Sequence, residues 1–331
     1  MKKQNLYNFI FLATTMLGVS TAQAQNLNHF MNNAIQGVTE QVVGQVAKQM
    51  ADQYKGTPYM EQNKNIKEPN QCPQHYPAGM PVITHVDKDK VYRRSFYLCE
   101  SNYAVQLDPA TKNPIWVAEV LRGKEQANTF IKRVDNFQPH PLVPKPAQSA
   151  LNDYKGSGFD RGHMAPAADM LTEVAMNESF YLTNMVPQVG PNMNRGIWAD
   201  LEEEVRKWSV KRGEVIVFSG PIYSYKNGQP LTMGKSQVWV PTHLYKIIFD
   251  PKKQESVAYL LPNVQVVTSK TRTLDKGNDH FQNTLPSNAV NCNRVCNINN
   301  FVVSVETVEQ YLGVNLLPKV NPNVKKLKQP F

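Results

Sequence analysis

Apolar side chains recur along residues 27–55 at steps of three and four positions, and this spacing predicts a helix with one hydrophobic stripe. The opposite face consists mostly of Asn and Gln. We expect the helix to pack on the domain or to join a second copy of the chain in a homo-oligomer, because a helix on a membrane surface normally has a basic face. The stripe consists of Leu27, Met31, Ile35, Val38, Val42, Val46, Met50 and Tyr54.

From Cys72 onward, short runs rich in β-branched and aromatic residues replace the helical spacing, and clusters of Pro, Asn and Gly separate most of them. Two stretches remain helical. Residues 196–210 place four large apolar side chains on one face, and Ser304 can cap a helix that Gly313 ends. The mixture predicts an α+β domain. The expected strands are Val91–Leu98, Tyr103–Leu107, Val215–Phe218, Val238–Val240, Leu244–Phe249 and Val257–Leu261.

The first residues follow another pattern. Lys2 and Lys3 precede an apolar stretch, and Ala22-Gln23-Ala24 forms an A-x-A site, which together predict a signal peptide at 1–24. The alternative is an uncleaved anchor, for which the apolar stretch is too short. We therefore expect a secreted or periplasmic protein without stable membrane insertion after cleavage. The remaining boundaries are a helical extension at 25–62, a linker at 63–70, the main domain at 71–318 and a basic, disordered tail at 319–331.

The composition, with 41% hydrophobic and 19% charged residues among 331, is that of a globular protein. Removing Lys2 and Lys3 with the leader takes the formal charge from +9 to +7. A basic chain suits a polyanionic partner, because contacts to phosphate supply most of the sequence-independent affinity for nucleic acids.

The cysteines are four in number: Cys72, Cys99, Cys292 and Cys296. In an exported chain an even number indicates disulfides, and three pairings are open. We favour Cys72–Cys99 and Cys292–Cys296, which both close local loops. A structural zinc site is the alternative, but the chain has no C-x2-C pair and no histidine near Cys292.

The stretch Tyr154–Asp169 contains the most informative chemistry. Its three glycines permit tight turns, and Arg161 and His163 stand two positions apart, so an extended segment places both on one side. A guanidinium group binds phosphate oxygens in a bidentate fork. An imidazole titrates near neutrality and can take a proton from water. This pair suits phosphodiester hydrolysis.

A second stretch, Asn194–Glu202, leads into the expected helix. Eight residues of helix give about 80° of net rotation and about 12 Å of rise, so both end residues can share one side. One hydrated ion can then connect them, because Mg²⁺ keeps most of its water and accepts one or two protein oxygens. A neutral Asn ligand leaves most of the ion's charge to stabilise the transition state.

These motifs resemble the DNA/RNA non-specific endonuclease family. The resemblance rests on several ordered motifs with matching spacing, and it spans about Cys72 to Leu317. The motifs are Asp160-Arg161-Gly162-His163-Met-Ala-Pro-Ala, Thr183-Asn184-Met-Val-Pro-Gln188, Asn194-Arg-Gly-Ile-Trp198 and Leu201-Glu202.

The resemblance implies a ββα-metal fold, with a central antiparallel sheet flanked by helices. It implies His163 as the general base, Asn194 as the direct Mg²⁺ ligand (with Mn²⁺ as a substitute), and Glu202 as the residue that holds water on the ion and helps to protonate the leaving oxygen. Arg161 matches the arginine that stabilises the phosphate. Asn184 matches a second active-site asparagine, and Arg133 a further substrate arginine. The implied products of DNA and RNA carry 5′-phosphate and 3′-hydroxyl ends.

Several residues near these motifs are expected to have structural roles. Asp160 is expected to be a turn or orienting residue, and Trp198 part of the core. Three rival functions stay open: an inactive nucleic-acid-binding protein, an envelope protein that assembles through the 27–55 helix, and a phosphodiesterase for a small or lipid substrate. The histidine spacing does not match an H-E-x-x-H zinc site, and Ser157 lacks a G-x-S-x-G context.

Overall fold

The computed structural model describes residues 72–84, 95–224, 230–264 and 297–326, with no side-chain description at positions 191 and 192. All of these residues belong to the second of two compact units, 65–331. The predictions for the leader, the helical extension with its oligomeric role, the linker and the Cys292–Cys296 loop lie outside the described residues.

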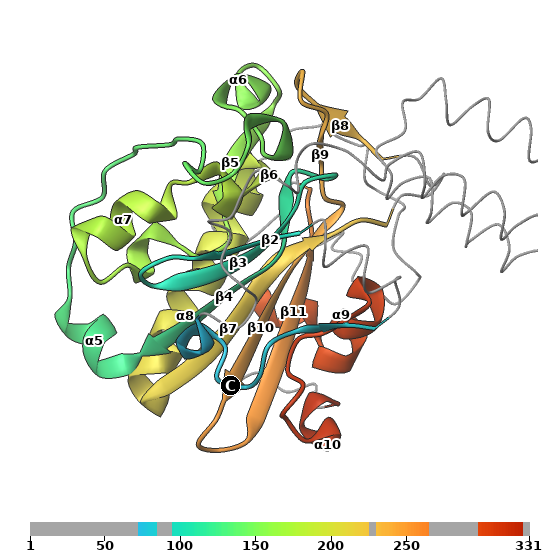
Figure 1. The fold of residues 1–331 in the computed structure, drawn as a ribbon. Helices are drawn as coiled ribbons and strands as arrows, with labels where there is room; N and C mark the ends of the chain where they lie inside the picture. Colours follow the sequence, from blue (N-terminus) through green and yellow to red (C-terminus); the bar gives the residue numbers. More distant parts are fainter. Residues whose placement is uncertain (1–71, 85–94, 225–229, 265–296, 327–331) are drawn as a thin grey trace, which may run out of the picture. The chain divides into compact units, whose positions relative to one another are not determined.

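A seven-stranded antiparallel sheet forms the centre of the domain (Figure 1). Its inner strands are buried on both faces, because helix α8 (Trp198–Arg212) packs on β4 and β7 while the N-terminal segment covers the opposite face through Tyr76 and Trp116. The strands in spatial order are β12 (Val302–Val303), β11 (Glu255–Pro262), β10 (His243–Asp250), β7 (Glu214–Ile222), β4 (Asn113–Arg122), β3 (Tyr103–Asp108) and β2 (Phe96–Cys99).

A smaller unit of two strands and a helix carries the sequence motifs. β5 (Phe159–His163) pairs antiparallel with β6 (Met185–Val189). A π-helix, η5 (Gly190–Ile197), then leads into α8. The stripe predicted for residues 196–210 is confirmed, because Leu201 and Val205 are almost completely buried.

Shorter elements complete the domain. α9 (Val305–Leu312) begins at the predicted Ser304 cap, whose hydroxyl accepts a hydrogen bond from the Thr307 amide (3.1 Å), and it ends at Gly313 with a left-handed backbone. The other α-helices described are α5 (Gly123–Asn128), α6 (Leu151–Tyr154), α7 (Glu173–Ser179) and α10 (Pro322–Lys325). The 3-10 turns are η1 (Pro73–His75), η2 (Lys145–Ala147), η3 (Ala167–Asp169), η4 (Leu182–Asn184) and η7 (Ile298–Phe301). Two small antiparallel pairs are β1 (Val82–Ile83) with β13 (Val314–Asn315), and β8 (Thr232–Met233) with β9 (Val238–Trp239).

The sequence pattern does not predict β4, although this strand lies inside the sheet, between β7 and β3. Nearly all of its residues are buried, so polar and apolar positions do not alternate along it. A strand covered on both faces cannot be distinguished from other apolar runs by periodicity.

The expectation of a disordered tail from Lys319 is wrong for its first eight residues. Lys325 is buried, and its ammonium group lies 3.1 Å from the Glu309 carboxylate and 2.6 Å from the Asn315 amide oxygen. The Ser256 hydroxyl also donates to the Val324 carbonyl at 2.8 Å. The basic residues of the tail favoured disorder in the prediction, but one of them, Lys325, forms a buried ion pair.

Two of the cysteines lie beside one tyrosine. The Tyr76 hydroxyl donates to Cys72 Sγ at 3.8 Å. Burial raises the pKa of Tyr76, and the nearby sulfurs of Cys72 and Cys99 raise it further. The pairing of these two cysteines stays a prediction.

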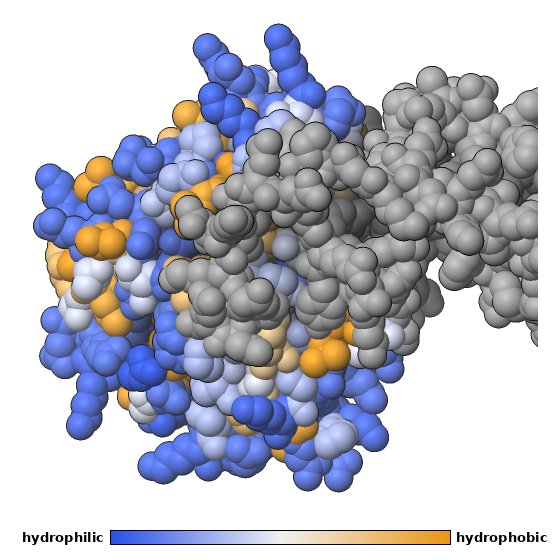
Figure 2. All heavy atoms as spheres, in the orientation of Figure 1, coloured by the Kyte–Doolittle hydropathy of each residue, from blue (hydrophilic) through white to orange (hydrophobic). Residues whose placement is uncertain are grey.

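The coloured part of the face drawn in Figure 2 is mainly polar, with hydrophobic spots on the side of α5 and α7. Phe130 (92% exposed) and Val174 (60% exposed) are the most exposed of the large hydrophobic side chains described. None of the described helices is long and apolar enough to cross a membrane.

Candidate active site

Strand β5 presents Arg161 and His163 on the same side, as the spacing predicts. Both side chains contact the Phe137 ring: the Arg161 guanidinium carbon lies 4.1 Å from its centroid, and the His163 centroid lies 5.8 Å from it. Between them, Gly162 is packed directly against the Gln188 side chain of β6, where a Cβ atom would collide. The glycine therefore lets the two strands approach closely at the site.

Two aromatic rings, Phe137 and Phe180, organise this side of the strand; we refer to them as the aromatic pair. Their centroids lie 4.8 Å apart in an edge-to-face arrangement, and the His163 ring packs edge-to-face on Phe180 at 4.9 Å. A guanidinium group also lies over each of the two rings. Arg161 lies over Phe137 at 4.1 Å and Arg133 over Phe180 at 5.0 Å. Two cations thus flank one imidazole.

This environment keeps the imidazole neutral. Burial lowers the pKa of His163 to about 3, and the positive charges of Arg133 and Arg161 contribute to the decrease. Its Nε2 atom is buried without a hydrogen-bond partner in the described part of the chain. A neutral ring can accept a proton, but a pKa of about 3 makes it a weak base in the ligand-free protein. The negative charge of a bound phosphate would raise this pKa toward the neutral range, where a general base is effective.

The segment that carries Phe137 is held against α7's end by backbone pairing. The Gln138 amide donates to the Phe180 carbonyl at 3.2 Å, and the Leu182 amide donates to the Gln138 carbonyl at 2.9 Å. These bonds explain why two phenylalanines that are 43 positions apart in the chain, Phe137 and Phe180, meet at one histidine.

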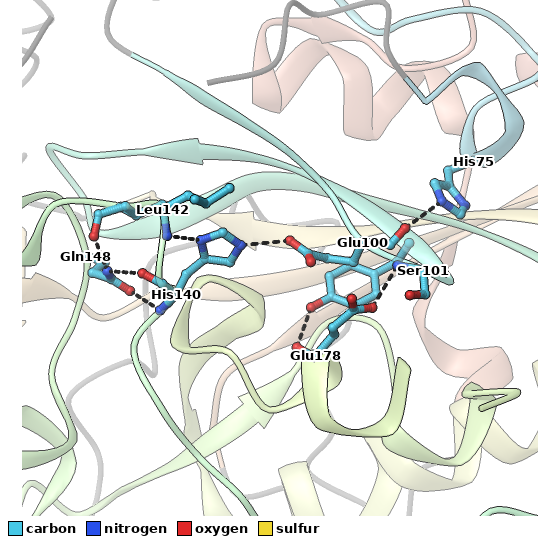
Figure 3. Close-up of polar contacts among 9 residues, drawn as sticks. His75, Glu100, Ser101, His140, Leu142, Gln148 and Glu178 are labelled. Carbon is cyan, nitrogen blue, oxygen red and sulfur yellow. Dashed lines mark hydrogen bonds and ion pairs between the residues drawn. The ribbon is translucent and has the colours of Figure 1, made fainter. Parts of the chain in front are cut away.

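A buried polar cluster anchors the same segment from behind (Figure 3). His140 Nδ1 accepts a hydrogen bond from the Leu142 amide at 3.1 Å, so Nε2 carries the hydrogen and donates to the Glu100 carboxylate at 3.0 Å. The Gln148 side chain bonds both the amide (2.7 Å) and the carbonyl (2.9 Å) of His140. The cluster fixes the chain three residues after Phe137.

Asp160 connects β5 to the π-helix. Its carboxylate accepts hydrogen bonds from the Asn194 amide nitrogen at 2.8 Å and from the Arg195 guanidinium at 2.6 Å. Gly190 makes room for this contact, because a Cβ there would come within 2.8 Å of both Asp160 oxygens. A carboxylate only accepts hydrogen bonds, so the amide nitrogen of Asn194 must face it and the amide oxygen is directed elsewhere. The predicted orienting role of Asp160 fits this geometry.

Glu202 and His163 share one neighbour, Trp198. The indole N–H of Trp198 donates to the His163 carbonyl at 3.3 Å, and its side chain also hydrogen-bonds to the Glu202 carboxyl. Burial raises the pKa of Glu202 to about 7, which Lys246 opposes and Asp169 reinforces. Glu202 Oε1 has no hydrogen-bond partner among the residues that the structure describes. Trp198 is part of the core, as expected, and also lies between the backbone of His163 and the side chain of Glu202.

Asn184 lies directly behind the site and is completely buried. Its side-chain oxygen accepts from the Ala165 amide, and its nitrogen donates to the carbonyls of Ala165 and Ser179, each at 2.9 Å. Its own carbonyl accepts from the Met164 amide at 3.0 Å. The side chain therefore holds the chain that follows His163, and its part in catalysis stays a prediction.

The structure brings Arg133, Arg161 and His163 together at the aromatic pair, and it connects Asn194 and Glu202 to the same strand through Asp160 and Trp198. Sequence reasoning missed the aromatic pair. In the sequence, Phe137 gave one indication of this pair, because it ends the Arg133–Phe137 stretch that the family resemblance included. No group of three or more His, Cys, Asp or Glu side chains converges as a metal cage in the described ranges.

Comparison with known proteins relates this geometry to a family. The sequence pattern of the DNA/RNA non-specific endonucleases matches residues 84–323. The chain belongs to this family. The family, and with it the enzyme class of phosphodiester-hydrolysing nucleases, is confirmed.

Three curated nucleases illustrate the similarity. The chain is 34% identical to Nuclease 1, mitochondrial, of Schizosaccharomyces pombe, over 68% of this chain and 66% of that protein. It is 44% identical to Nuclease C1 of Cunninghamella echinulata, over 53% and 74% of the two chains. Human endonuclease G, mitochondrial, is 28% identical over 76% and 75%. The chain thus spans about two thirds to three quarters of these relatives' lengths.

A solved structure supports the same fold. A chain in the crystal structure of the EndoG/EndoGI complex superposes with a TM-score of 0.58 and 27% identity, over 77% of this chain and 94% of that one. The ββα unit of β5, β6 and α8 beside a central antiparallel sheet confirms the fold class expected for the endonuclease family.

The expectation of a secreted or periplasmic protein is wrong on this comparison. Relatives from fission yeast, budding yeast, Xenopus laevis and human are named mitochondrial nucleases, which points to mitochondria rather than to secretion. The first 24 residues contain Lys2 and Lys3 and no acidic residue. Such a charge pattern is common to secretory and mitochondrial leaders, so charge could not separate them.

We predict that His163 stays neutral in the folded, ligand-free endonuclease at mildly acidic pH, because its pKa is lowered to about 3. The unfolded chain binds this proton below about pH 6.5, so acidification from there toward the folded pKa lowers stability. Nitrogen NMR of histidine-labelled protein checks this, with His163→Asn for assignment because the pKa of His243 is also lowered to about 3. A His163 ring that titrates near about 6.5 contradicts the prediction.

Proposed function

We propose that the chain is a Mg²⁺-dependent endonuclease that hydrolyses phosphodiester bonds of DNA and RNA, with His163 as the general base. The observation that carries the proposal is the neutral imidazole between two guanidinium groups on the aromatic pair. The family membership of the chain supports the substrate class.

The two arginines are suited to hold the scissile phosphate. Stacking on Phe137 and Phe180 fixes the planes of the two guanidinium groups, and their N–H donors can bind phosphate oxygens in forks. Arg133 is more exposed and also bonds Asp135 at 2.7 Å, so its contact with substrate replaces a surface ion pair. Contacts to phosphate carry no base identity, which favours broad specificity.

His163 takes the proton from the attacking water. Its Nε2 atom is the nitrogen without a partner in the described residues, and the lowered pKa leaves it unprotonated. The resulting hydroxide attacks phosphorus in line with the leaving 3′ oxygen. Cleavage in this direction leaves a 5′-phosphate and a 3′-hydroxyl end. The nearby guanidinium groups stabilise the negative charge that develops on the phosphate oxygens.

The residues near η5 fit a hydrated divalent cation. Asp160 fixes the amide of Asn194 by its nitrogen, so the amide oxygen remains as a hard ligand of the kind that Mg²⁺ and Mn²⁺ accept. When bound, the ion supplies Lewis-acid stabilisation of the transition-state charge.

Glu202 is suited to return the proton. Its pKa near 7 means that a fraction of the carboxyl groups is protonated at neutral pH, and its Oε1 atom has no other partner within the described ranges. A carboxylic acid there can protonate the leaving 3′ oxygen. Asn184 supports the reaction indirectly, by holding the chain that follows His163.

The first test is digestion of supercoiled plasmid and of RNA in Mg²⁺, in EDTA, and with two single variants. We expect His163→Ala and Glu202→Gln each to lower kcat by about 100- to 10,000-fold, the usual contribution of acid–base catalysis. Glu203→Gln is the matched control, because Glu203 is exposed on the next position of α8 and pairs with Lys207. Oligonucleotide binding without cleavage by the wild type would support the inactive rival and refute the proposal.

A second test concerns the orienting carboxylate. We expect Asp160→Ala to raise the Mg²⁺ concentration needed for half-maximal rate by about 10- to 100-fold, as removal of outer partners of metal ligands usually does. Calorimetric titration with Mn²⁺ measures the same loss without substrate. Arg195→Met, which removes the other partner of Asp160, should have a smaller effect. An unchanged metal requirement in Asp160→Ala would exclude this role.

A further inference from the structure

A buried lysine lies beneath the site. Lys246 is in the middle of β10 and is 1% exposed, on the face of the sheet that α8 covers. Removing an ammonium group from water is unfavourable by several kcal/mol unless charges and hydrogen bonds compensate it. The partners of Lys246 therefore indicate the role of its buried ammonium group.

Its nearest contacts lead to the active site. The ammonium group donates to the Ser219 hydroxyl at 2.6 Å and lies 3.5 Å from the carbonyl of Met164, the residue after His163. It also lies 4.8 Å from the centroid of the Trp198 ring. Trp198 is the residue whose indole N–H reaches the His163 carbonyl and whose side chain bonds Glu202. One cation thus touches the end of β5 and the start of α8.

The lysine also lies among buried acidic groups. Three buried carboxyl groups, those of Glu119, Asp169 and Glu202, interact with it electrostatically, and the second cation among them is Arg206, 2.8 Å from Asp169. Burial raises the pKa of Glu119 well above its ordinary range, while Lys246 lowers it. Glu119 Oε2 has no hydrogen-bond partner in the part of the chain described.

Sheet register explains why these groups meet. Lys246 pairs with Ser219 across β10 and β7, and Ser219 pairs with Val117 across β7 and β4. Glu119 stands two positions after Val117 and therefore on the same face of the sheet. Three adjacent strands thus place polar side chains under the first turns of α8, away from solvent and from the groups that face substrate.

We propose that Lys246 is a positioning residue for hydrolysis: its ammonium group holds Trp198 and the backbone carbonyl of Met164 in place, so that His163 and Glu202 keep their relative places. This inference rests on the proposed function. Lys246 does not contact substrate, so its loss should change turnover and not substrate affinity.

The central experiment is Lys246→Met, which keeps the apolar stem and removes the charge. We expect kcat to fall by about 10- to 100-fold, in line with other residues that orient catalytic groups. The Kd for a fluorescent oligonucleotide, measured in EDTA by anisotropy, should change by less than about 2-fold, because Arg133 and Arg161 are untouched. Lys207→Met is the control, since Lys207 lies on the exposed side of α8 with Glu203 and Glu204.

A second substitution tests the same contact with a smaller change. If Lys246→Met does not fold by circular dichroism, Ser219→Ala decides: it should lower kcat at least about 3-fold with unchanged Kd.

Unchanged kcat in a folded Lys246→Met, or equal losses in kcat and binding, would overturn the inference. These outcomes are distinct from failure of the proposed function. In that case wild-type protein would not cut plasmid or RNA in Mg²⁺, and no comparison of turnover between variants would exist.

Discussion

The structure depends on the contact between a buried imidazole and two phenylalanine rings. Phe137 and Phe180 both pack against the His163 ring, and a guanidinium group lies over each of them. Burial and positive charge act in the same direction on histidine, because both disfavour its protonated form. The same two rings thus keep the base neutral and place the cations that a phosphate requires.

The remaining parts of the site are fixed relative to this cluster by a few hydrogen bonds. Asp160, on the same strand, orients Asn194 in the π-helix, and Trp198 bridges the backbone of His163 to Glu202. π-Helical turns are uncommon and often occur at functional sites, where they alter the direction of a side chain. The site is therefore assembled from one antiparallel strand pair, one irregular turn and the first turn of α8, all supported by the sheet beneath.

Much of this was predictable from the sequence, for identifiable reasons. The spacing of Arg161 and His163 places both on one face of any extended segment, and the stripe of Leu201 and Val205 predicts which side of α8 is buried. Such inferences need only local geometry. The ordered motifs then identified the family, which the match over residues 84–323 confirms.

Other features depend on pairing between distant segments, and local patterns do not encode them. Phe137 reaches His163 because Gln138 pairs with the chain around Phe180, and the isolated sequence gives no sign of that pairing. The motif marks Asn184 as an active-site asparagine, but it does not show that the amide bonds the backbone of Ala165 and Ser179. Lys325 lies in a basic segment whose composition is typical of a disordered tail, but its side chain is a buried ion-pair partner of Glu309.

In the proposed mechanism, one phosphorus atom lies between the His163 imidazole and an ion on Asn194. A crystal structure with Mg²⁺ and a dinucleotide whose scissile 3′ oxygen is replaced by a methylene group tests it most directly. We predict that His163 Nε2 faces the phosphorus from the side opposite the methylene group, with the ion on the Asn194 amide oxygen and both guanidinium groups on phosphate oxygens. A phosphate bound with its attacked face turned away from His163, or an ion held without Asn194, would contradict the proposed mechanism.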